Sequence, residues 1–201
     1  MNKEILENYN KYLERKALFK SFGYDVDSER EFILSQAQPF SGRILEAGTG
    51  KGHFTLALAK AGYCFTTFDI SEQEQGFAKL IIEHFGFKNQ VDFRIENAES
   101  TSFAAESFDV VFSVNVLHHL LNPCRVLDEF IRIISPRGKL ILADFTDEGF
   151  RVMDQIHGLE GNKHGMGEIS LNAARSYLLK KGLLAEKTSS THQSVLLASK
   201  C

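Results

Sequence analysis

Residues 44–54 read ILEAGTGKGHF, with three glycines inside five positions directly after an apolar run. Glycine adopts positive φ and has no Cβ, so a turn of this composition lets a ligand approach the peptide groups closely. The apolar run predicts a strand that ends at Glu46 and Ala47, and a helix is expected to begin near His53 with unpaired N–H groups in its first turn. The stretch therefore predicts a cradle for a small ligand between a strand and a helix.

The rest of the chain repeats the order of strand and helix that this stretch begins. Apolar runs predict strands at 43–47, 64–69, 91–95, 109–114 and 139–144. Helix-like stretches between them predict helices at 53–61, 72–85 and 123–134. Farther on, the sequence predicts a helix over 170–182 and then two strands, at 184–190 and 194–200. The expected fold is α/β, a Rossmann-like, doubly wound and mostly parallel sheet with a C-terminal antiparallel hairpin.

The chain reads as one domain with a helical appendage. Residues 1–38 carry apolar side chains at roughly helical spacing among charges, with Gly23 as a stop signal. No linker rich in proline, serine or glycine follows, so we expect a lid that packs on a single compact unit of residues 39–201. Several glycines and two histidines without a clean period make the stretch 147–167 look irregular.

Composition restricts the class of partner. The chain of 201 residues has a formal net charge of -3, so no broad basic field favours general binding to nucleic acid. Its three cysteines form no CxxC pair, which is typical of reduced thiols in a cytoplasm. The charged N-terminal stretch predicts neither a signal peptide nor a membrane span, and a cytoplasmic location is expected. A homodimer is possible, and the sequence does not decide it.

The spacing of the glycines separates two classes of nucleotide ligand. A dinucleotide fingerprint, G-x-G-x-x-G, starting at Gly48 requires glycine at position 53, and this chain has His53 there. An acid, Glu46, instead precedes the first glycine by two residues. A carboxylate at that place repels a diphosphate and suits a ligand that carries an ammonium or sulfonium group.

Two further positions suit a nucleoside. Asp69 ends the next strand-like run, where its carboxylate can accept both hydroxyl hydrogens of a ribose. Asn97 and Ala98 follow the third expected strand, where a side-chain amide and a backbone N–H can pair with the edge of an adenine ring. The three elements together predict a nucleoside ligand at the carboxyl ends of the strands.

Four signatures occur in order along roughly residues 40–145. They are LEAGTGKGHFT, FDIS, NAES with FDVVFSVNVLHHL, and PCRVLDEFIRIISPRGKLILADF. In this combination the chain resembles the class I S-adenosylmethionine-dependent methyltransferases, and within them small-molecule enzymes similar to the ubiquinone and menaquinone C-methyltransferases. The resemblance implies S-adenosylmethionine as cofactor, a small-molecule acceptor, and in-line displacement of the methyl group from the sulfonium.

The resemblance also implies which residues hold the cofactor. The methionine part is expected on Glu46, Ala47, Gly48, Thr49, Gly50 and Gly52. The ribose and the adenine are expected on Asp69, Ile70, Asn97, Ala98 and Glu99, and the sulfonium above Asn115 and Val116. The family usually has Asp at position 97; Asn loses a charge-assisted bond there, which weakens binding by roughly 1 kcal/mol.

Structural interpretations of the same residues remain open. Glu46 is alternatively a strand-end carboxylate bonded to nearby loop groups, and Asp69 a helix N-cap. The side chains of Thr49, Lys51 and Thr55 are expected to be helix-start and solvent residues rather than ligands.

Histidines are the candidates for catalysis. His118 and His119 follow the fourth expected strand, close to the acceptor, where an imidazole can act as a base or orient an oxygen. The alternative is a structural or cofactor-side role for at least one of the two. His157 and His164 lie in the stretch after the fifth strand, where the family commonly builds its substrate wall. Asp144 either bonds a substrate hydroxyl or caps the next turn. A metal site of His157, Glu160 and His164 has irregular spacing, and no metal is expected.

The acceptor and its reacting atom are not set by the sequence. The tetrapeptide N/D-P-P-Y/F/W, which marks enzymes that methylate exocyclic base nitrogens or glutamine amides, is absent where this chain reads SVNV. A protein or tRNA methyltransferase and a cofactor-binding regulatory protein without turnover remain the alternatives to a small-molecule enzyme.

Overall fold

The computed structural model describes residues 3–159 and 169–200. A seven-stranded sheet in the order β3-β2-β1-β4-β5-β7-β6 forms its centre. The strands are β1 (Ile44–Ala47), β2 (Phe65–Asp69), β3 (Val91–Ile95), β4 (Phe108–Val114), β5 (Ile134–Phe145), β6 (Leu183–Ser189) and β7 (Gln193–Lys200). The first five pair in parallel, and β7 pairs antiparallel with both β5 and β6. The predicted doubly wound sheet with a C-terminal hairpin is confirmed.

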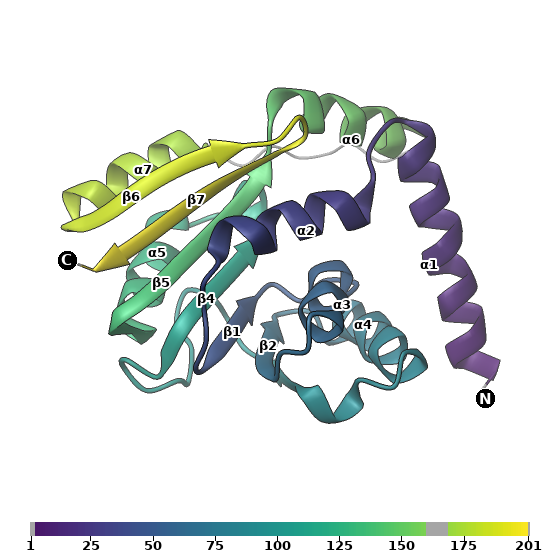
Figure 1. Ribbon diagram of the computed structural model, residues 1–201, viewed down its shortest axis with the longest axis horizontal. Coiled ribbons are helices and arrows are strands. Elements are labelled where there is room, and N and C mark those ends of the chain that lie inside the picture. The colour runs from purple at the N-terminus through teal and green to yellow at the C-terminus, as the bar shows by residue number, and fades with distance from the viewer. Residues whose placement is uncertain (1–2, 160–168, 201) are drawn as a thin grey trace.

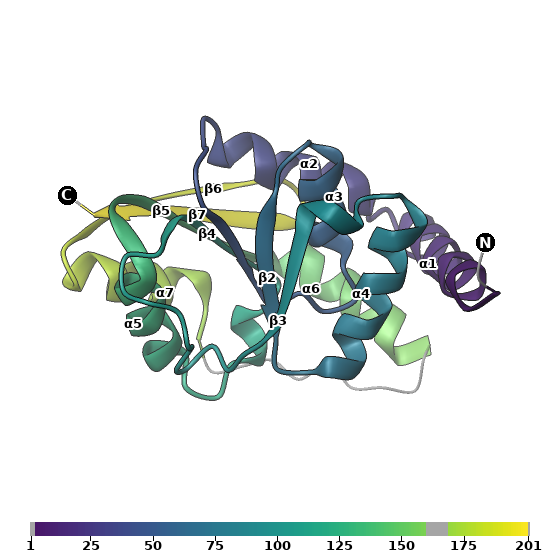
Figure 2. The same ribbon diagram turned by 90° about the horizontal axis from the view of Figure 1, so that it is seen from below.

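Helices cover both faces of the sheet, as Figure 2 shows with α2 and α3 on one side and α5 and α7 on the other. The helices are α1 (Lys3–Ser21), α2 (Val26–Ala37), α3 (His53–Lys60), α4 (Glu72–His84), α5 (Pro123–Ile133), α6 (Asp147–Leu159) and α7 (Leu171–Lys180). Two short 3-10 turns, η1 (Lys88–Gln90) and η2 (Leu117–His119), precede β3 and follow β4.

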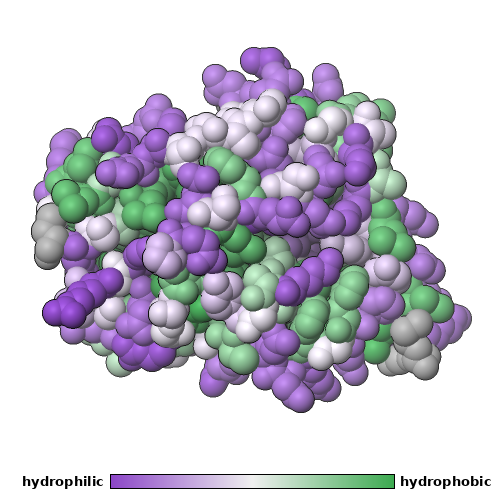
Figure 3. All heavy atoms as spheres, viewed as in Figure 1, coloured by the Kyte–Doolittle hydropathy of each residue, from purple (hydrophilic) through white to green (hydrophobic). Residues whose placement is uncertain are grey.

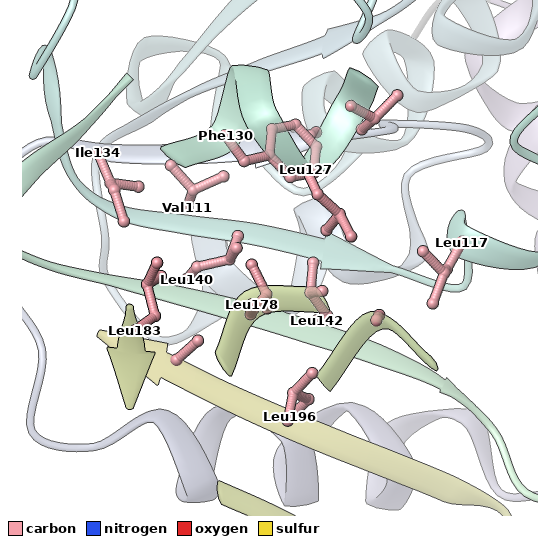
Figure 4. Close-up of a cluster of buried hydrophobic side chains, with 14 of the residues drawn as sticks. Val111, Leu117, Leu127, Phe130, Ile134, Leu140, Leu142, Leu178, Leu183 and Leu196 are labelled. Carbon is pink, nitrogen blue, oxygen red and sulfur yellow. The ribbon is translucent and has the colours of Figure 1, made fainter. Parts of the chain in front are cut away.

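The core lies between the sheet and each helical layer because the central strands are apolar on both faces. On the α5–α7 side, Val111 and Leu142 of the sheet pack with Phe130 of α5 and Leu178 of α7 (Figure 4). On the other side, Val110 and the rest of a second buried cluster pack under α2 and α3. A central strand with two apolar faces is typical of a parallel sheet that is covered on both sides.

The N-terminal helices α1 and α2 lie against the sheet domain. Figure 1 shows α2 crossing in front of the sheet and α1 running along the side of α4. Asp25 caps α2 by accepting hydrogen bonds from the N–H groups of Asp27 and Ser28. Phe19 and Tyr24 form a third buried cluster with Met153 and Ile156 of α6. The lid helices therefore reach the same region as α6.

The expectation of irregular structure after residue 145 is wrong for 147–159, which form α6. Its buried positions are Gly149, Val152, Met153 and Ile156, a helical spacing. Gly149 disguised this pattern, because glycine usually signals a loop. Here an added Cβ would lie 2.3 Å from the carbonyl oxygen of His192, so the missing side chain lets α6 approach the β6–β7 hairpin.

Hydrophilic side chains spread over most of the face in Figure 3, with a green area at the left, where β6 and α7 lie. Leu179 and Leu184 are exposed in that part of the chain. In residues 3–159 and 169–200, no helix has the length and apolar character that a membrane span requires.

Candidate active site

A cleft of about 670 Å³ opens at the carboxyl ends of β1, β2 and β4. The strand order reverses between β1 and β4, and in open α/β sheets ligands bind at this point. The sequence-predicted residues that line it are Glu46, Ala47, Gly48, Thr49, Gly50, Asp69, Ile70, Asn97, Ala98, Glu99, Asn115, Val116, His118 and His157. Gly52 is outside this lining, and His164 and Glu160 lie outside the described residues.

The three glycines of the turn have different structural reasons. All three have positive φ, at 90° for Gly48, 49° for Gly50 and 85° for Gly52. A Cβ on Gly48 would lie 2.3 Å from a methyl of Val116, and one on Gly52 would lie 2.8 Å from the Cβ of Ala78 in α4. A Cβ on Gly50 would meet no atom within 4 Å. Gly52 therefore serves the packing of α3 on α4, whereas Gly50 faces open space.

The amide groups of the turn are already bonded within the protein. The N–H groups of Gly48 and Thr49 donate to the carbonyl oxygen of Phe68 at 2.8 and 3.0 Å. The Gly50 N–H donates to Asp69 Oδ2 at 2.7 Å. A diphosphate-binding turn needs such N–H groups to point at the ligand. The turn is consequently poorly suited to a dinucleotide.

Glu46 lies beneath the turn and is 1% exposed. Its Oε2 accepts hydrogen bonds from the hydroxyls of Thr55 and Thr67, each at 2.7 Å. Burial raises the pKa of Glu46 to about 8, in spite of these two bonds and the nearby Arg30. A cationic ligand group beside it would favour the ionised form.

The prediction that Thr49 and Thr55 face solvent is wrong, since both are buried. The hydroxyl of Thr49 lies 2.7 Å from that of Thr67, which in turn bonds to Glu46. Because α3 begins directly over the end of β1, its first turn points into the protein rather than outward. The two threonines thus support the carboxyl group of Glu46.

Asp69 joins the turn to the next helix. Its Oδ2 accepts from Gly50, and its Oδ1 accepts from the N–H of Ser71 at 2.9 Å. The N-cap of α4 is Ser71, whose hydroxyl accepts from the N–H of Glu74. The alternative interpretation of Asp69 as the helix N-cap is therefore wrong. Its carboxylate is positioned at the cleft by two backbone groups.

The far end of the cleft follows β3. Asn97 Oδ1 accepts from the N–H of Glu99 at 2.9 Å, which closes a tight turn. Glu99 Oε1 accepts from the amide of Asn122 at 2.9 Å, so the turn is tied to the start of α5. Ile70 is 71% exposed beside this end, an apolar surface that suits a flat ring.

The end of β4 carries two unusual features. Asn115 has φ 56°, and its Oδ1 is buried without a hydrogen-bond partner among the described residues. His118 Nδ1 lies 2.6 Å from Asp144 Oδ1, and Asp144 Oδ2 accepts from the His118 N–H at 3.1 Å. Both side chains are buried. Asp144 thus fixes the orientation of His118, a role that neither sequence interpretation of Asp144 contained.

A protein-family model described as a methyltransferase domain matches residues 45–142. Together with the curated relatives, this match supports a class I S-adenosylmethionine-dependent methyltransferase. It is 32% identical over 122 residues to a ubiquinone biosynthesis O-methyltransferase from Dechloromonas aromatica, a match that covers 60% of this chain and 52% of the relative. The chain spans about half the length of the curated O-methyltransferases with this name that it matches.

Solved structures agree with a class I methyltransferase fold. The [4+2]-cyclase SpnF superposes with a TM-score of 0.71 at 17% identity, covering 88% of this chain and 82% of that one. The magnesium protoporphyrin IX methyltransferase ChlM from Synechocystis, solved with bound SAH, gives a TM-score of 0.62 at 23% identity and covers 88% and 82%. The cofactor of this class of methyltransferases is S-adenosylmethionine.

The cleft also contains residues outside the site set expected from the sequence. Arg15, Phe19, Tyr24 and Arg30 come from the lid helices, and Met153 comes from α6. The arginines carry no signal in the sequence, because arginines among helical charges are usually solvated. Only the return of the lid over the sheet places them at the cleft.

Proposed function

We propose that this chain transfers the methyl group of S-adenosylmethionine to a small organic acceptor by in-line displacement. The observation that carries the proposal is the buried carboxyl group of Glu46 under a glycine turn whose amides at 48–50 are already bonded. This arrangement suits an ammonium group and disfavours a diphosphate. When bound, the cofactor supplies an already activated methyl group on a sulfonium.

The residues around the cleft suit the parts of the cofactor in order. Glu46, Ala47, Gly48, Thr49 and Gly50 are proposed to hold the methionine part, with Gly52 supporting them through helix packing. Asp69 is proposed to bind the ribose, Ile70 to cover the adenine, and Asn97, Ala98 and Glu99 to read its edge. Asn115 and Val116 are proposed to lie under the reacting centre, where the buried Asn115 Oδ1 lacks a partner in the described residues.

The remaining cleft wall suits a small acceptor. Phe19 and Tyr24 from the lid, Phe145 from β5 and Met153 from α6 line it with apolar surface. Such a wall excludes water and aligns an acceptor with the methyl group, which is most of what this displacement requires from a protein.

His118 is proposed as the group that removes or orients a proton, held by Asp144. His157 also lines the cleft from α6, and His164 remains a candidate outside the described residues. The name of the O-methyltransferase relative makes an oxygen acceptor the first class to test.

The decisive experiment measures S-adenosylhomocysteine release from S-adenosylmethionine with a panel of small phenols, amines, thiols and activated carbon acids. Wild-type protein is expected to bind the cofactor and to turn over at least one class. Asp69→Ala should lose cofactor binding, whereas Asp92→Asn, an exposed control on β3, should not. Tight cofactor binding without turnover on the whole panel would contradict methyl transfer and support a regulatory role. Saturation by a nicotinamide coenzyme instead would overturn the cofactor assignment.

A further inference from the structure

Charge is distributed unevenly along the cleft. Acidic side chains line the end proposed for ribose and adenine, namely Asp69, Glu96 and Glu99. Two further carboxyl groups line the cleft, Glu46 under the glycine turn and Glu74 beside Lys51. Basic side chains line the opposite end, namely Arg15, Arg30 and Lys51. The protein as a whole has a formal net charge of -3, so this basic end does not reflect a general excess of cations.

Arg30 is the most informative of these cations. Its side chain belongs to α2 and is 8% exposed. Its Nη1 donates to the hydroxyl oxygen of Tyr24 at 3.0 Å, while its Nε has no hydrogen-bond partner among the residues described. Within residues 3–159 and 169–200, no carboxylate lies within ion-pair distance of the Arg30 guanidinium. A buried guanidinium without a counter-ion is costly, and an anionic ligand in the cleft would relieve that cost.

The hydroxyl of Tyr24 is fixed rather than adaptable. Its oxygen accepts from Arg30 and also from Gln193 Nε2 at 2.9 Å. Both contacts are buried, so Tyr24 holds the guanidinium at the cleft without neutralising it. The orientation of Arg30 is therefore set before any ligand binds.

A second cavity of about 400 Å³ continues the basic region between α1 and α4. Arg15, Lys51 and His53 line both cavities, so these side chains form their shared boundary. The second cavity adds the cation Lys11 and the aromatic rings of Tyr12 and Phe77, and Glu14 is its acidic member. Lys51 has a partner at its edge, Glu74, at 3.9 Å, and both side chains are substantially exposed.

The pKa of His53 is influenced by the same cations. Burial is the main cause that lowers the pKa of His53 to about 3, and Arg30, Arg15 and Lys51 each lower it further. The nearby Asp27 opposes them but is itself paired with Lys16. His53 is therefore neutral at neutral pH and offers a ring surface, stacked with Tyr12 at a centroid distance of 5.3 Å.

The cofactor itself does not remove this positive charge. S-adenosylmethionine carries a carboxylate, an ammonium and a sulfonium at neutral pH, which leaves one positive charge in excess. With its ammonium beside ionised Glu46 and its carboxylate paired with Arg30, one positive charge is left over, that of the sulfonium. An anionic acceptor would neutralise this charge. Its approach to the methyl carbon, whose bond to the sulfonium sulfur breaks as the new bond forms, would be favoured by the opposite charges in a water-excluding cleft.

We propose that the acceptor is a small aromatic anion, with a carboxylate as the simplest case, held by Arg30 and the cations of the α1–α4 cavity. The inference rests on the proposed function, because it names the acceptor class of that site. The apolar and aromatic walls bind the ring, and the cations bind the negative group. An uncharged acceptor of the same shape leaves the buried guanidinium unpaired.

The test compares hydroxybenzoates with the matching hydroxybenzamides in the presence of saturating S-adenosylhomocysteine, by titration calorimetry and ligand-observed NMR. Wild-type protein is expected to bind the best benzoate about tenfold more tightly than its amide. Arg30→Met or Lys11→Gln should remove or reduce this preference. Arg137→Met, an exposed cation at the amino end of β5, is the matched control and should keep it. Equal binding of acid and amide at every ring position would overturn the proposal.

Two further measurements show whether Arg30 binds the carboxylate of the cofactor or that of the acceptor. If Arg30→Met weakens S-adenosylhomocysteine but not 5′-methylthioadenosine, which lacks the amino-acid part, Arg30 pairs with the cofactor; the benzoate preference must then fall in Lys11→Gln. If both nucleosides bind as in wild type, the loss of preference in Arg30→Met assigns Arg30 to the acceptor. A preference that survives in both variants overturns the proposal. Failure of S-adenosylhomocysteine to bind wild type would instead refute the proposed function.

Discussion

Glu46→Gln separates a cofactor-binding carboxylate from a structural one. The carboxyl group is buried, bonds to Thr55 and Thr67, and has a pKa raised from 4.5 to about 8. Since the folded pKa is above the unfolded one, its contribution to stability is fully present below about pH 4.5 and is lost as the pH rises through 8. At pH 7 the difference of two and a half units corresponds to an ionic-form penalty on the order of 3 kcal/mol.

Glutamine keeps an oxygen for the two threonine hydroxyls and never ionises. We therefore expect the substitution to leave the unliganded protein as stable as wild type at pH 5 and more stable at pH 8, in urea unfolding experiments. Cofactor affinity should fall by roughly tenfold to a hundredfold, because a charged hydrogen-bond partner of the ammonium is lost.

Calorimetry gives an independent check of the same reasoning. An ammonium beside Glu46 favours its ionised form, so cofactor binding at pH 7 should release close to one proton from the wild-type protein. The binding heat should then vary with the ionisation enthalpy of the buffer, and this variation should disappear in Glu46→Gln. A variant that is several kcal/mol less stable at pH 7 yet binds the cofactor with wild-type affinity would refute the reasoning and make Glu46 structural.

Further predictions concern the helix contacts and the second titrating group. Gly52→Ala should destabilise the fold by about 1–3 kcal/mol through the contact with Ala78 while changing cofactor affinity little, and Gly50→Ala should show the reverse ranking; urea midpoints and calorimetric affinities would show whether the two effects separate. Gly149→Ala should lower stability by about 2 kcal/mol or more, since its Cβ meets the His192 carbonyl, and an unchanged urea midpoint would refute the packing of α6. His53 has a folded pKa of about 3, below its unfolded 6.5, so its contribution is present above pH 6.5 and is lost as the pH falls toward 3; His53→Phe should flatten that acid limb in unfolding experiments from pH 3 to 7. Asp144→Asn should reduce turnover more than cofactor affinity and alter the pH profile of kcat, whereas equal losses in both would indicate a structural role alone.

The order of strands and helices was readable from the sequence because a parallel sheet covered on both faces needs apolar central strands. The runs VVFSV and LILAD are apolar, as strands that are buried on both faces should be. The glycine turn at 48–52 marks the switch point, where the strand order reverses. The segment of α6 was misread because Gly149 and Gly158 suggest a loop. However, a helix also needs glycine where a neighbouring backbone approaches it closely. At Gly149 that backbone belongs to the hairpin, more than forty residues later in the chain.

Glycines and charged residues of the site have different roles that look alike in the sequence, and only the tertiary structure distinguishes these roles. Gly50 and Gly52 look equivalent in the motif, yet one faces the cleft and the other packs α3 on α4. The position of Asp69 at the end of a strand predicts that it lies at the cleft, because the topology of parallel strands brings their carboxyl ends together. Arg30 has no comparable signal, since it lies in a lid whose docking depends on Phe19 and Tyr24 meeting α6. The residues proposed to bind the cofactor are thus predictable from their places at strand ends, whereas the residues proposed to choose the acceptor come from the segments that cover the cleft.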